Sequence, residues 1–209
     1  MENARPEPGA ELNPGAETVP RIAATVILLR GEEHGLEVLL AQRNPAARFM
    51  GGAWVFPGGA VSHGDGDGDA ALRAAAVREL REEAGIEIAD PGELLAFSRW
   101  ITPAEVRIRY DTWFFLAAAP EDAQPRVDGQ EVVDARWFTP ADALTASREG
   151  EILLVFPTIK HLEQLSSFGS AHELLAHART REVRPVQPRV LMSGETARIV
   201  LPGELGYDD

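Results

Sequence analysis

Three glutamates in one short segment are the side chains of this sequence best suited to chemistry. Glu79, Glu82 and Glu83 stand in residues 78–86, which read Arg-Glu-Leu-Arg-Glu-Glu-Ala-Gly-Ile. On a helix, Glu79 and Glu83 lie within about 40° of each other, with Glu82 beside them. Like charges at this spacing repel, and burying them unpaired would cost far more free energy. A hard divalent cation, which prefers oxygen ligands, would relieve both costs.

The alternative for the same helix is a solvated acidic face, paired with Arg78 and Arg81. For glutamates near arginines considered alone, this alternative is the more common outcome. Two further features favour a metal site. A glycine turn, Pro57-Gly58-Gly59, precedes the helix, and apolar residues share the sector of Glu79 and Glu83. These apolar residues are Leu72, Ala76 and Ile86.

The segment and the glycine turn together resemble a known family. Residues 78–86 fit the pattern Arg-Glu-U-x-Glu-Glu-x-Gly-U of the Nudix hydrolases, in which U is aliphatic, at every specified position. The resemblance covers residues 20–150 approximately. It implies an α/β/α sandwich with a mixed β-sheet. It also implies hydrolysis of a diphosphate bond between a nucleoside and another moiety.

The resemblance assigns roles to individual residues. The metal ion would be Mg²⁺ or Mn²⁺, held by glutamates and by the backbone carbonyl near Gly59. The expected metal-binding set is Glu79, Glu82, Glu83 and Gly59. Arg78 would orient the carboxylates by salt bridging. The residues expected to shape the site without binding metal are Arg78, Gly58 and Gly85.

The segment between the glycine turn and the helix departs from the family pattern. Residues 60–69 are longer than the fixed family spacing, and Ala70 stands where a glutamate is expected. The inserted loop carries three aspartates, Asp65, Asp67 and Asp69. One of these aspartates is a candidate to replace the missing glutamate, and the sequence does not decide which.

Hydrolysis also requires an acceptor for the proton of the attacking water. Glu131 precedes Trp137 by six residues, a distance at which some Nudix proteins carry a further metal ligand or base. Glu105, after Pro103, is the competing candidate. The expected catalytic residues are Glu82, Glu83 and Glu131.

The stretch before the glycine turn resembles the coenzyme A-cleaving branch of the family. It has Arg48, a glycine at position 52, and Phe-Pro-Gly-Gly at 56–59, preceded by leucines at 39 and 40. The implied substrate is CoA or acyl-CoA, cleaved to 3′,5′-ADP and 4′-phosphopantetheine or its acyl form. Arg43, Arg48 and Arg109, with Arg107, could meet the phosphates, although a surface ion pair is the alternative for each.

Other functions remain open for the same sequence. Hydrolysis of ADP-ribose or another nucleoside diphosphate derivative is the nearest alternative. A non-catalytic nucleotide sensor on the same fold is the alternative from another class. The complete set of carboxylates, and the lack of a basic recognition helix towards the C-terminus, favour the enzyme.

The elements that must position these residues follow from periodicity and turn residues. Strands are expected at 22–29, 36–42, 53–56, 94–101, 107–117 and 131–138. Helices are expected at 69–84, with Asp69 as the N-cap, and at 141–147, 157–168 and 170–178. Because strands and helices do not alternate regularly, an α+β fold with a mixed sheet is favoured over a doubly wound parallel sheet.

Three regions are expected along the chain. Residues 1–19, rich in Pro, Glu, Gly and Ala, predict a disordered tail. Residues 20–150 form the expected Nudix hydrolase domain, and residues 151–209 a C-terminal helical extension packed on it. Within that extension, residues 184–203 are expected to form a loop or hairpin.

Composition restricts the partners and the compartment. A formal net charge of −13 means that most of the surface would repel a nucleic-acid polymer or an anionic membrane. The absence of cysteine excludes disulfides and thiolate chemistry and fits a cytoplasmic protein. No membrane-spanning run and no secretory signal is expected. The expected partner is a small-molecule nucleotide, and a homodimer is left open.

Overall fold

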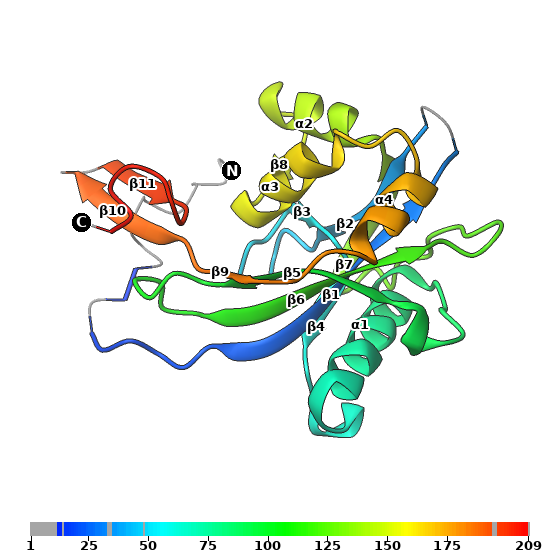
Figure 1. Ribbon diagram of the computed structural model, residues 1–209, viewed down its shortest axis with the longest axis horizontal. Coiled ribbons are helices and arrows are strands. Elements are labelled where there is room, and N and C mark those ends of the chain that lie inside the picture. The colour runs from blue at the N-terminus through cyan, green and yellow to red at the C-terminus, as the bar shows by residue number, and fades with distance from the viewer. Residues whose placement is uncertain (1–11, 14, 33–34, 48, 194–195, 209) are drawn as a thin grey trace.

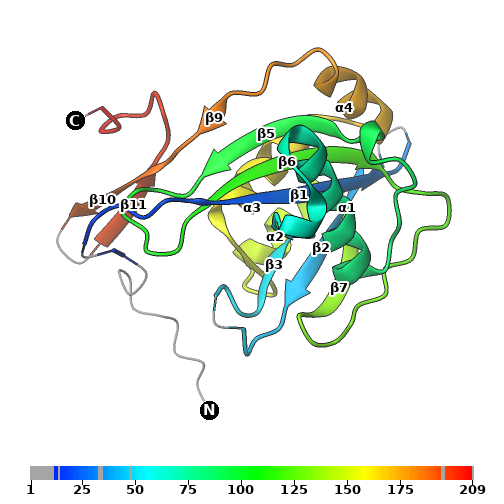
Figure 2. The same ribbon diagram turned by 90° about the horizontal axis from the view of Figure 1, so that it is seen from below.

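A computed structural model describes residues 12–13, 15–32, 35–47, 49–193 and 196–208. It confirms the expected α+β fold, in which helices cover both faces of a mixed β-sheet (Figures 1 and 2). The helices are α1 (Gly68–Ala84), α2 (Pro140–Arg148), α3 (Phe156–Leu165) and α4 (Ala171–Ala178), with short 3-10 turns η1 (His63–Asp65) and η2 (Pro91–Glu93). The strands are β1 (Arg21–Arg30), β2 (Glu37–Arg43), β3 (Ala53–Val55), β4 (Gly58–Ala60), β5 (Leu95–Ile101), β6 (Tyr110–Ala118), β7 (Val132–Phe138), β8 (Leu153–Leu154), β9 (Pro185–Val186), β10 (Arg189–Ser193) and β11 (Thr196–Val200).

The two strands at the centre of the sheet meet at one end and diverge towards the other. β1 pairs antiparallel with β2 where Leu29 faces Val38. Farther along, β1 pairs with β4, where Ala24 faces Gly59, while β2 pairs with β3 and β7. The short connection through Pro57 therefore crosses from the β2 side to the β1 side. This crossing brings the glycine turn to the strand over which α1 packs.

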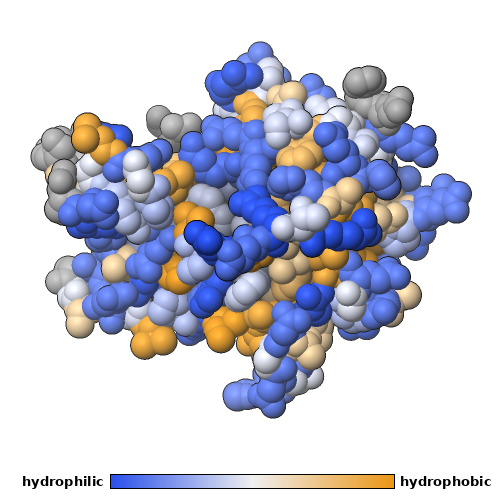
Figure 3. Space-filling model, viewed as in Figure 1, coloured by the Kyte–Doolittle hydropathy of each residue, from blue (hydrophilic) through white to orange (hydrophobic). Residues whose placement is uncertain are grey.

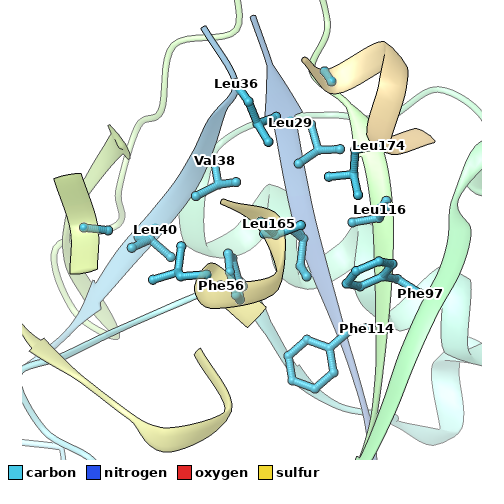
Figure 4. Close-up of a cluster of buried hydrophobic side chains, with 14 of the residues drawn as sticks. Leu29, Leu36, Val38, Leu40, Phe56, Phe97, Phe114, Leu116, Leu165 and Leu174 are labelled. Atoms are coloured by element: carbon cyan, nitrogen blue, oxygen red, sulfur yellow. The ribbon is translucent and has the colours of Figure 1, made fainter. Parts of the chain in front are cut away.

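The core consists of two apolar layers, one on each face of the sheet. Alternate residues of β1 point to opposite faces, as strand geometry requires. Val26 packs in the layer with α1, and Ile27 packs in the layer with α3 and α4. Figure 4 shows the second layer, where Leu165 of α3 and Leu174 of α4 lie over the strands. Figure 2 shows α1 on the opposite face.

After β8, the C-terminal segment forms two helices and continues as strands. Helices α3 and α4 contribute to the same core as the sheet. After them, β9 adds to the edge of the sheet beside β5, and β10 and β11 form a separate hairpin at one end of the molecule (Figure 1). This hairpin falls within residues 184–203, where a loop or hairpin was expected, and the prolines of that stretch suit it because proline cannot continue a helix.

Residues 12, 13 and 15–19, expected to be part of a disordered tail, are held against the connection between β5 and β6. The amide of Asn13 donates to the carbonyl of Glu105 at 2.6 Å. Arg109 pairs with the carboxylate of Glu17 and donates to the carbonyl of Thr18 at 2.6 Å. A buried guanidinium needs such partners, which is the physical reason for the order. Residues 1–11 and 14 lie outside the described residues.

The surface carries no sign of a membrane segment in the described residues. None of their helices has the length and apolar character needed to cross a bilayer. The face in Figure 3 is mostly hydrophilic, with apolar residues in scattered patches. Scattered apolar side chains are ordinary on a folded protein.

His161 is buried in the layer between the sheet and α3, with 1% of its surface exposed. Its Nδ1 lies 2.7 Å from the carbonyl of Pro157, and its Nε2 lies 2.6 Å from Oγ of Ser98. Since a carbonyl can only accept, Nδ1 carries the hydrogen, and Nε2 accepts from the Ser98 hydroxyl. The ring is packed against Phe114, with centroids 4.3 Å apart. Burial lowers the pKa of His161 to about 4, so the folded protein holds it neutral.

This neutral histidine should make the fold less stable in mild acid. The unfolded chain takes up the proton below the ordinary pKa of 6.5, whereas the folded chain does so only near pH 4. The contribution of neutral His161 to the unfolding free energy is therefore present above pH 6.5 and is lost as the pH falls from 6.5 towards 4. Between pH 7 and pH 5 the loss should be about 2 kcal/mol of unfolding free energy.

Urea unfolding of the wild type and of His161→Gln at both pH values measures this effect. The variant should lose about 2 kcal/mol less than the wild type over the same interval. His172, which is exposed, provides the matched control, and His172→Gln should keep the wild-type dependence. Equal pH dependence of His161→Gln and the wild type would contradict the assignment.

Candidate metal centre

Helix α1 presents the acidic segment, and its ends are fixed by local sequence. Gly85 ends the helix in the left-handed conformation, with φ of 65°, and its amide donates to the carbonyl of Arg81 at 2.9 Å. A side chain at this φ would be strained, so glycine suits the position. The helix begins after Asp67 and not after Asp69, the expected N-cap. Asp69 lies in the first turn, where it accepts a hydrogen bond from Arg73 at 2.6 Å.

Glu79 and Glu83 project from successive turns of α1 towards the sheet. Glu83 is 3% exposed, and its carboxylate accepts a hydrogen bond from the amide of Gly58 at 2.9 Å. Burial raises the pKa of Glu83 to about 7. Burial also raises the pKa of Glu79, although its hydrogen bond with Arg78 works against this shift. The protein thus places two carboxylates where their negative charges are poorly solvated.

The glycine turn allows the backbone to lie directly against these carboxylates. A Cβ at Gly59 would stand 2.5 Å from both Cδ and Oε1 of Glu79. A Cβ at Gly58 would stand 2.5 Å from the carbonyl oxygen of Ala24 and 2.6 Å from Cα of Thr25. Real Cβ atoms do not approach so closely, so a side chain at Gly58 would meet the backbone of β1, whereas one at Gly59 would displace the end of the Glu79 side chain.

Arg78 connects the acidic residues to one another. Its Nη1 donates to Glu79 at 2.7 Å and to Glu82 at 3.1 Å. Its Nε and Nη2 donate to the two carboxylate oxygens of Asp65, at 2.9 and 3.1 Å. Nη2 also donates to the carbonyl of Ala60 at 3.2 Å. The hydrogen bond with Asp65 is the largest cause of the raised pKa of Arg78, which remains a cation.

The third glutamate of the segment is less buried than the other two. The side chain of Glu82 is 51% exposed and is turned towards Arg78. Among the described residues, no group of three acidic, histidine or cysteine side chains is already arranged to hold a metal ion. The hydrogen bonds explain this, because Glu79 and Glu82 face Arg78 while Glu83 faces Gly58.

Two residues from the β2–β7 side change the pKa values of the acidic pair, Glu79 and Glu83, through their charges. Glu131 is exposed, immediately before β7, and its charge contributes to raising the pKa of both Glu79 and Glu83. Arg43, the last residue of β2, acts in the opposite sense on the pKa of Glu83. The Nε of Arg43 is buried and has no hydrogen-bond partner among the described residues.

Other residues expected at the site are not brought to it. Arg109 is 4% exposed and is engaged by Glu17, Thr18 and Thr102. Its guanidinium is buried, although the side chain of its partner Glu17 is 61% exposed, and a contact of Arg109 with phosphate stays a prediction. The carboxylate of Glu105 accepts from the amide of Val190 in the C-terminal hairpin, at 3.4 Å. The expected substrate contact at position 48 lies outside the described residues.

Asp65 is one of the three loop aspartates considered as replacements for the missing glutamate. The fold brings its carboxylate to Arg78, a contact that the sequence did not predict. A sequence signal for it did exist. Ser62 and Asp65 have the spacing of a capping pair, which predicts a local turn that orients the aspartate.

The match of a family model decides the classification. The model of the NUDIX domain matches residues 19–156. The chain belongs to the Nudix family. The crystal structure of a NUDIX hydrolase from Alicyclobacillus acidocaldarius is similar to this Nudix fold, with a TM-score of 0.70 and 28% sequence identity. That similarity covers 76% of this chain and 96% of the other.

Two curated proteins are also similar in sequence to this Nudix chain. Nudix hydrolase 7 of Caenorhabditis elegans is 28% identical over 182 residues, which cover 70% of this chain and 60% of that protein. The acyl-coenzyme A diphosphatase NUDT19 of Homo sapiens is 28% identical over 116 residues, which cover 53% of this chain and 31% of that protein. The matched regions therefore span less than two thirds of either relative.

The residues present fit the metal ion that this Nudix family implies. Nudix hydrolases generally use divalent ions such as Mg²⁺ or Mn²⁺. Such ions prefer carboxylate and carbonyl oxygens. Here two poorly solvated carboxylates lie beside the backbone of Gly59, with Glu82 on the adjacent turn. Burial raises the pKa of Glu79 and of Glu83, so a cation bound beside them would favour their charged forms.

Alanine substitutions of the two glycines should affect different properties, fold stability at Gly58 and metal binding at Gly59. Gly58→Ala would push against the backbone of β1 and should lower the unfolding free energy by about 2 kcal/mol or more. Gly59→Ala would push against the movable end of Glu79, so it should cost less than about 1 kcal/mol but displace that carboxylate. Urea unfolding without metal measures the first effect, and Mn²⁺ titration calorimetry of Gly59→Ala measures the second.

The two variants are each other's control, since both add one methyl group to the same turn. Equal destabilisation by both substitutions would contradict the described packing. Unchanged Mn²⁺ affinity in Gly59→Ala would show that the position of the Glu79 carboxylate does not affect metal binding.

Proposed function

We propose that this protein is a metal-dependent hydrolase that cleaves the diphosphate bond of a nucleoside diphosphate derivative. The observation that carries the proposal is a pair of carboxylates, Glu83 buried and Glu79 half-buried, beside Gly58 and Gly59. Burying such charges is costly unless a cation is bound there. Membership of the Nudix family supports the reaction class.

In the proposed site, glutamates of α1 and the backbone carbonyl of Gly59 would hold Mg²⁺ or Mn²⁺. Glu79, Glu82 and Glu83 would provide the carboxylates, and Arg78 donates hydrogen bonds to the first two through Nη1. When bound, the ion would neutralise the diphosphate and lower the pKa of a bound water.

A carboxylate of the chain would then accept the proton of the attacking water. Water adds to one phosphorus, the bond from that phosphorus to the bridging oxygen breaks, and a carboxylate accepts the proton. Glu131 and Glu83 are the two candidates for this base. Glu131 is exposed, so water can reach it, and its charge contributes to the raised pKa of Glu83. The carboxylate of Glu83 already accepts a hydrogen bond from the amide of Gly58.

The proposed substrate is CoA or acyl-CoA. The products would be 3′,5′-ADP and 4′-phosphopantetheine or its acyl form. The human relative named acyl-coenzyme A diphosphatase supports this choice. Arg43 supports a phosphate-bearing substrate in general, because its positive charge acts on Glu83 and a guanidinium group can bind phosphate oxygens. ADP-ribose and other nucleoside diphosphate derivatives remain the alternatives.

A substrate panel tests the assignment directly. The protein is incubated with Mg²⁺ or Mn²⁺ and CoA, an acyl-CoA, ADP-ribose, NADH or a dNTP, and the products are resolved by chromatography. We expect 3′,5′-ADP from CoA or acyl-CoA and no product after chelation of the metal. Turnover of ADP-ribose without turnover of CoA would replace the substrate. No turnover of any member, with Mn²⁺ bound, would indicate a nucleotide sensor.

Glu83→Gln should separate catalysis from folding. The amide keeps the size of the side chain and can still accept from Gly58, but it removes a charge. Hydrolysis should fall by more than about 100-fold. At pH 8 the unfolding free energy of the metal-free protein should rise by about 1–3 kcal/mol, because a poorly solvated charge is gone.

Product formation and urea unfolding measure the two effects on the same preparation. Glu87→Gln is the matched control, since Glu87 is exposed beyond the end of α1 and should tolerate the change. A variant at position 83 with the wild-type rate would remove the proposed metal site. Destabilisation at pH 8 would show that the Glu83 charge is well solvated or paired in the folded protein.

A further inference from the structure

The elongated loop between β4 and α1 is folded onto the helix at one point. The turn η1 ends in Asp65, whose side chain is 5% exposed, although residues 62–64 and 66–68 around it are exposed. The carboxylate of Asp65 accepts from the amide and the hydroxyl of Ser62, at 2.7 and 2.9 Å. These bonds fix the direction of the side chain before it reaches the helix.

On its other side, Asp65 forms a two-point contact with Arg78. Nε donates to Oδ1 at 2.9 Å, and Nη2 donates to Oδ2 at 3.1 Å. This planar arrangement fixes the orientation of a guanidinium as well as its position. It leaves Nη1 directed to Glu79 and Glu82. The hydrogen bond with Arg78 lowers the pKa of Asp65 to about 2, so the contact persists at neutral pH.

The other two aspartates of the loop do not make this contact. Asp69 pairs with Arg73, and its side chain is 65% exposed. Asp67 is exposed at the start of α1 and makes no capping hydrogen bond with its side chain. Of the three candidates, Asp65 alone reaches the arginine that holds the glutamates.

We propose that Asp65 is a positioning residue for the metal-binding carboxylates and acts through Arg78. This inference rests on the proposed function. With Asp65 in place, two sides of the guanidinium are occupied, and Arg78 can present only Nη1 to Glu79 and Glu82. Without it, the guanidinium is free to turn and to pair more fully with either glutamate. The carboxylates would then be less available to a cation.

The inserted loop therefore has a defined role in this chain. Ala70, where the family pattern has a glutamate, has no carboxylate. Asp65, 13 residues before Arg78, supplies a carboxylate to that arginine. The longer path of the chain is accommodated by the Ser62–Asp65 turn, which folds the loop back onto the helix. Metal affinity should consequently depend on a residue outside the helix that carries the ligands.

Asp65→Asn tests the proposal, because the amide keeps the shape and the Ser62 contact but loses the charge. Mn²⁺ binding is measured on the full chain without substrate, by the electron paramagnetic resonance signal of free Mn²⁺. We expect affinity to fall by about 10- to 100-fold, as is typical when a residue that orients a ligand is changed. In turnover assays, the Mn²⁺ concentration needed for half-maximal rate should rise by a similar factor, with a smaller change in kcat at saturating Mn²⁺.

Asp69→Asn is the matched control, because it removes another aspartate–arginine pair of the same helix without touching Arg78. It should bind Mn²⁺ as the wild type does. Asp65→Glu, which restores the charge, should recover part of the lost affinity. Circular dichroism of each metal-free variant checks that α1 is intact.

The outcomes distinguish this inference from the proposed function. A wild type that binds no Mn²⁺ would overturn the proposed function itself. A wild type that binds Mn²⁺, with Asp65→Asn equal to it, would overturn only the role of Asp65. An equal loss of affinity in Asp65→Asn and Asp69→Asn would also overturn it, since the effect would then come from the helix in general.

Discussion

The close approach of the Gly58–Gly59 backbone to helix α1 is the contact on which the candidate site depends. It exists because β1 and β2 diverge, so that the chain can leave β3, pass Pro57 and join β1 as β4. The amide of Gly58 then reaches Glu83, and the backbone of Gly59 lies against Glu79. The geometry of the sheet thus sets the distance between the carboxylates and the turn. A side chain at Gly58 would push against β1, and one at Gly59 would displace the Glu79 carboxylate.

This arrangement concentrates negative charge where water cannot solvate it well. The carboxylates near the turn outnumber the guanidinium groups of Arg78 and Arg43. Arg78 is shared among several carboxylates, so it neutralises none of them fully. Burial, with a smaller contribution from the neighbouring charge of Glu79, raises the pKa of Glu83. A bound divalent cation would supply the missing charge without the volume of another side chain.

Much of this could be predicted from sequence because the decisive spacings are local. Helical periodicity places Glu79 and Glu83 on one sector, and Gly85 marks the end of the helix. The start of the helix was misplaced by two residues because Asp67 and Asp69 are both suitable caps, and only the backbone conformation at Asp67 distinguishes them. The parallel pairing of β1 with β6 joins residues about 90 positions apart, and no local pattern encodes it.

The arginines show where local reasoning fails. Arg43 and Arg109 are the same residue type, each in a strand or next to one, and the sequence offered both as phosphate contacts. In the fold, Nη1 of Arg109 is satisfied by Glu17 and Thr18, 92 and 91 positions away, and Nε is satisfied by the carbonyl of Thr102, seven positions away. Releasing these donors to a ligand would break those bonds. Nε of Arg43 has no partner among the described residues, so binding an anion would satisfy a donor that folding leaves without one. The distinction depends on tertiary contacts, and for that reason a phosphate-binding arginine is recognised by the donors that the fold leaves unused.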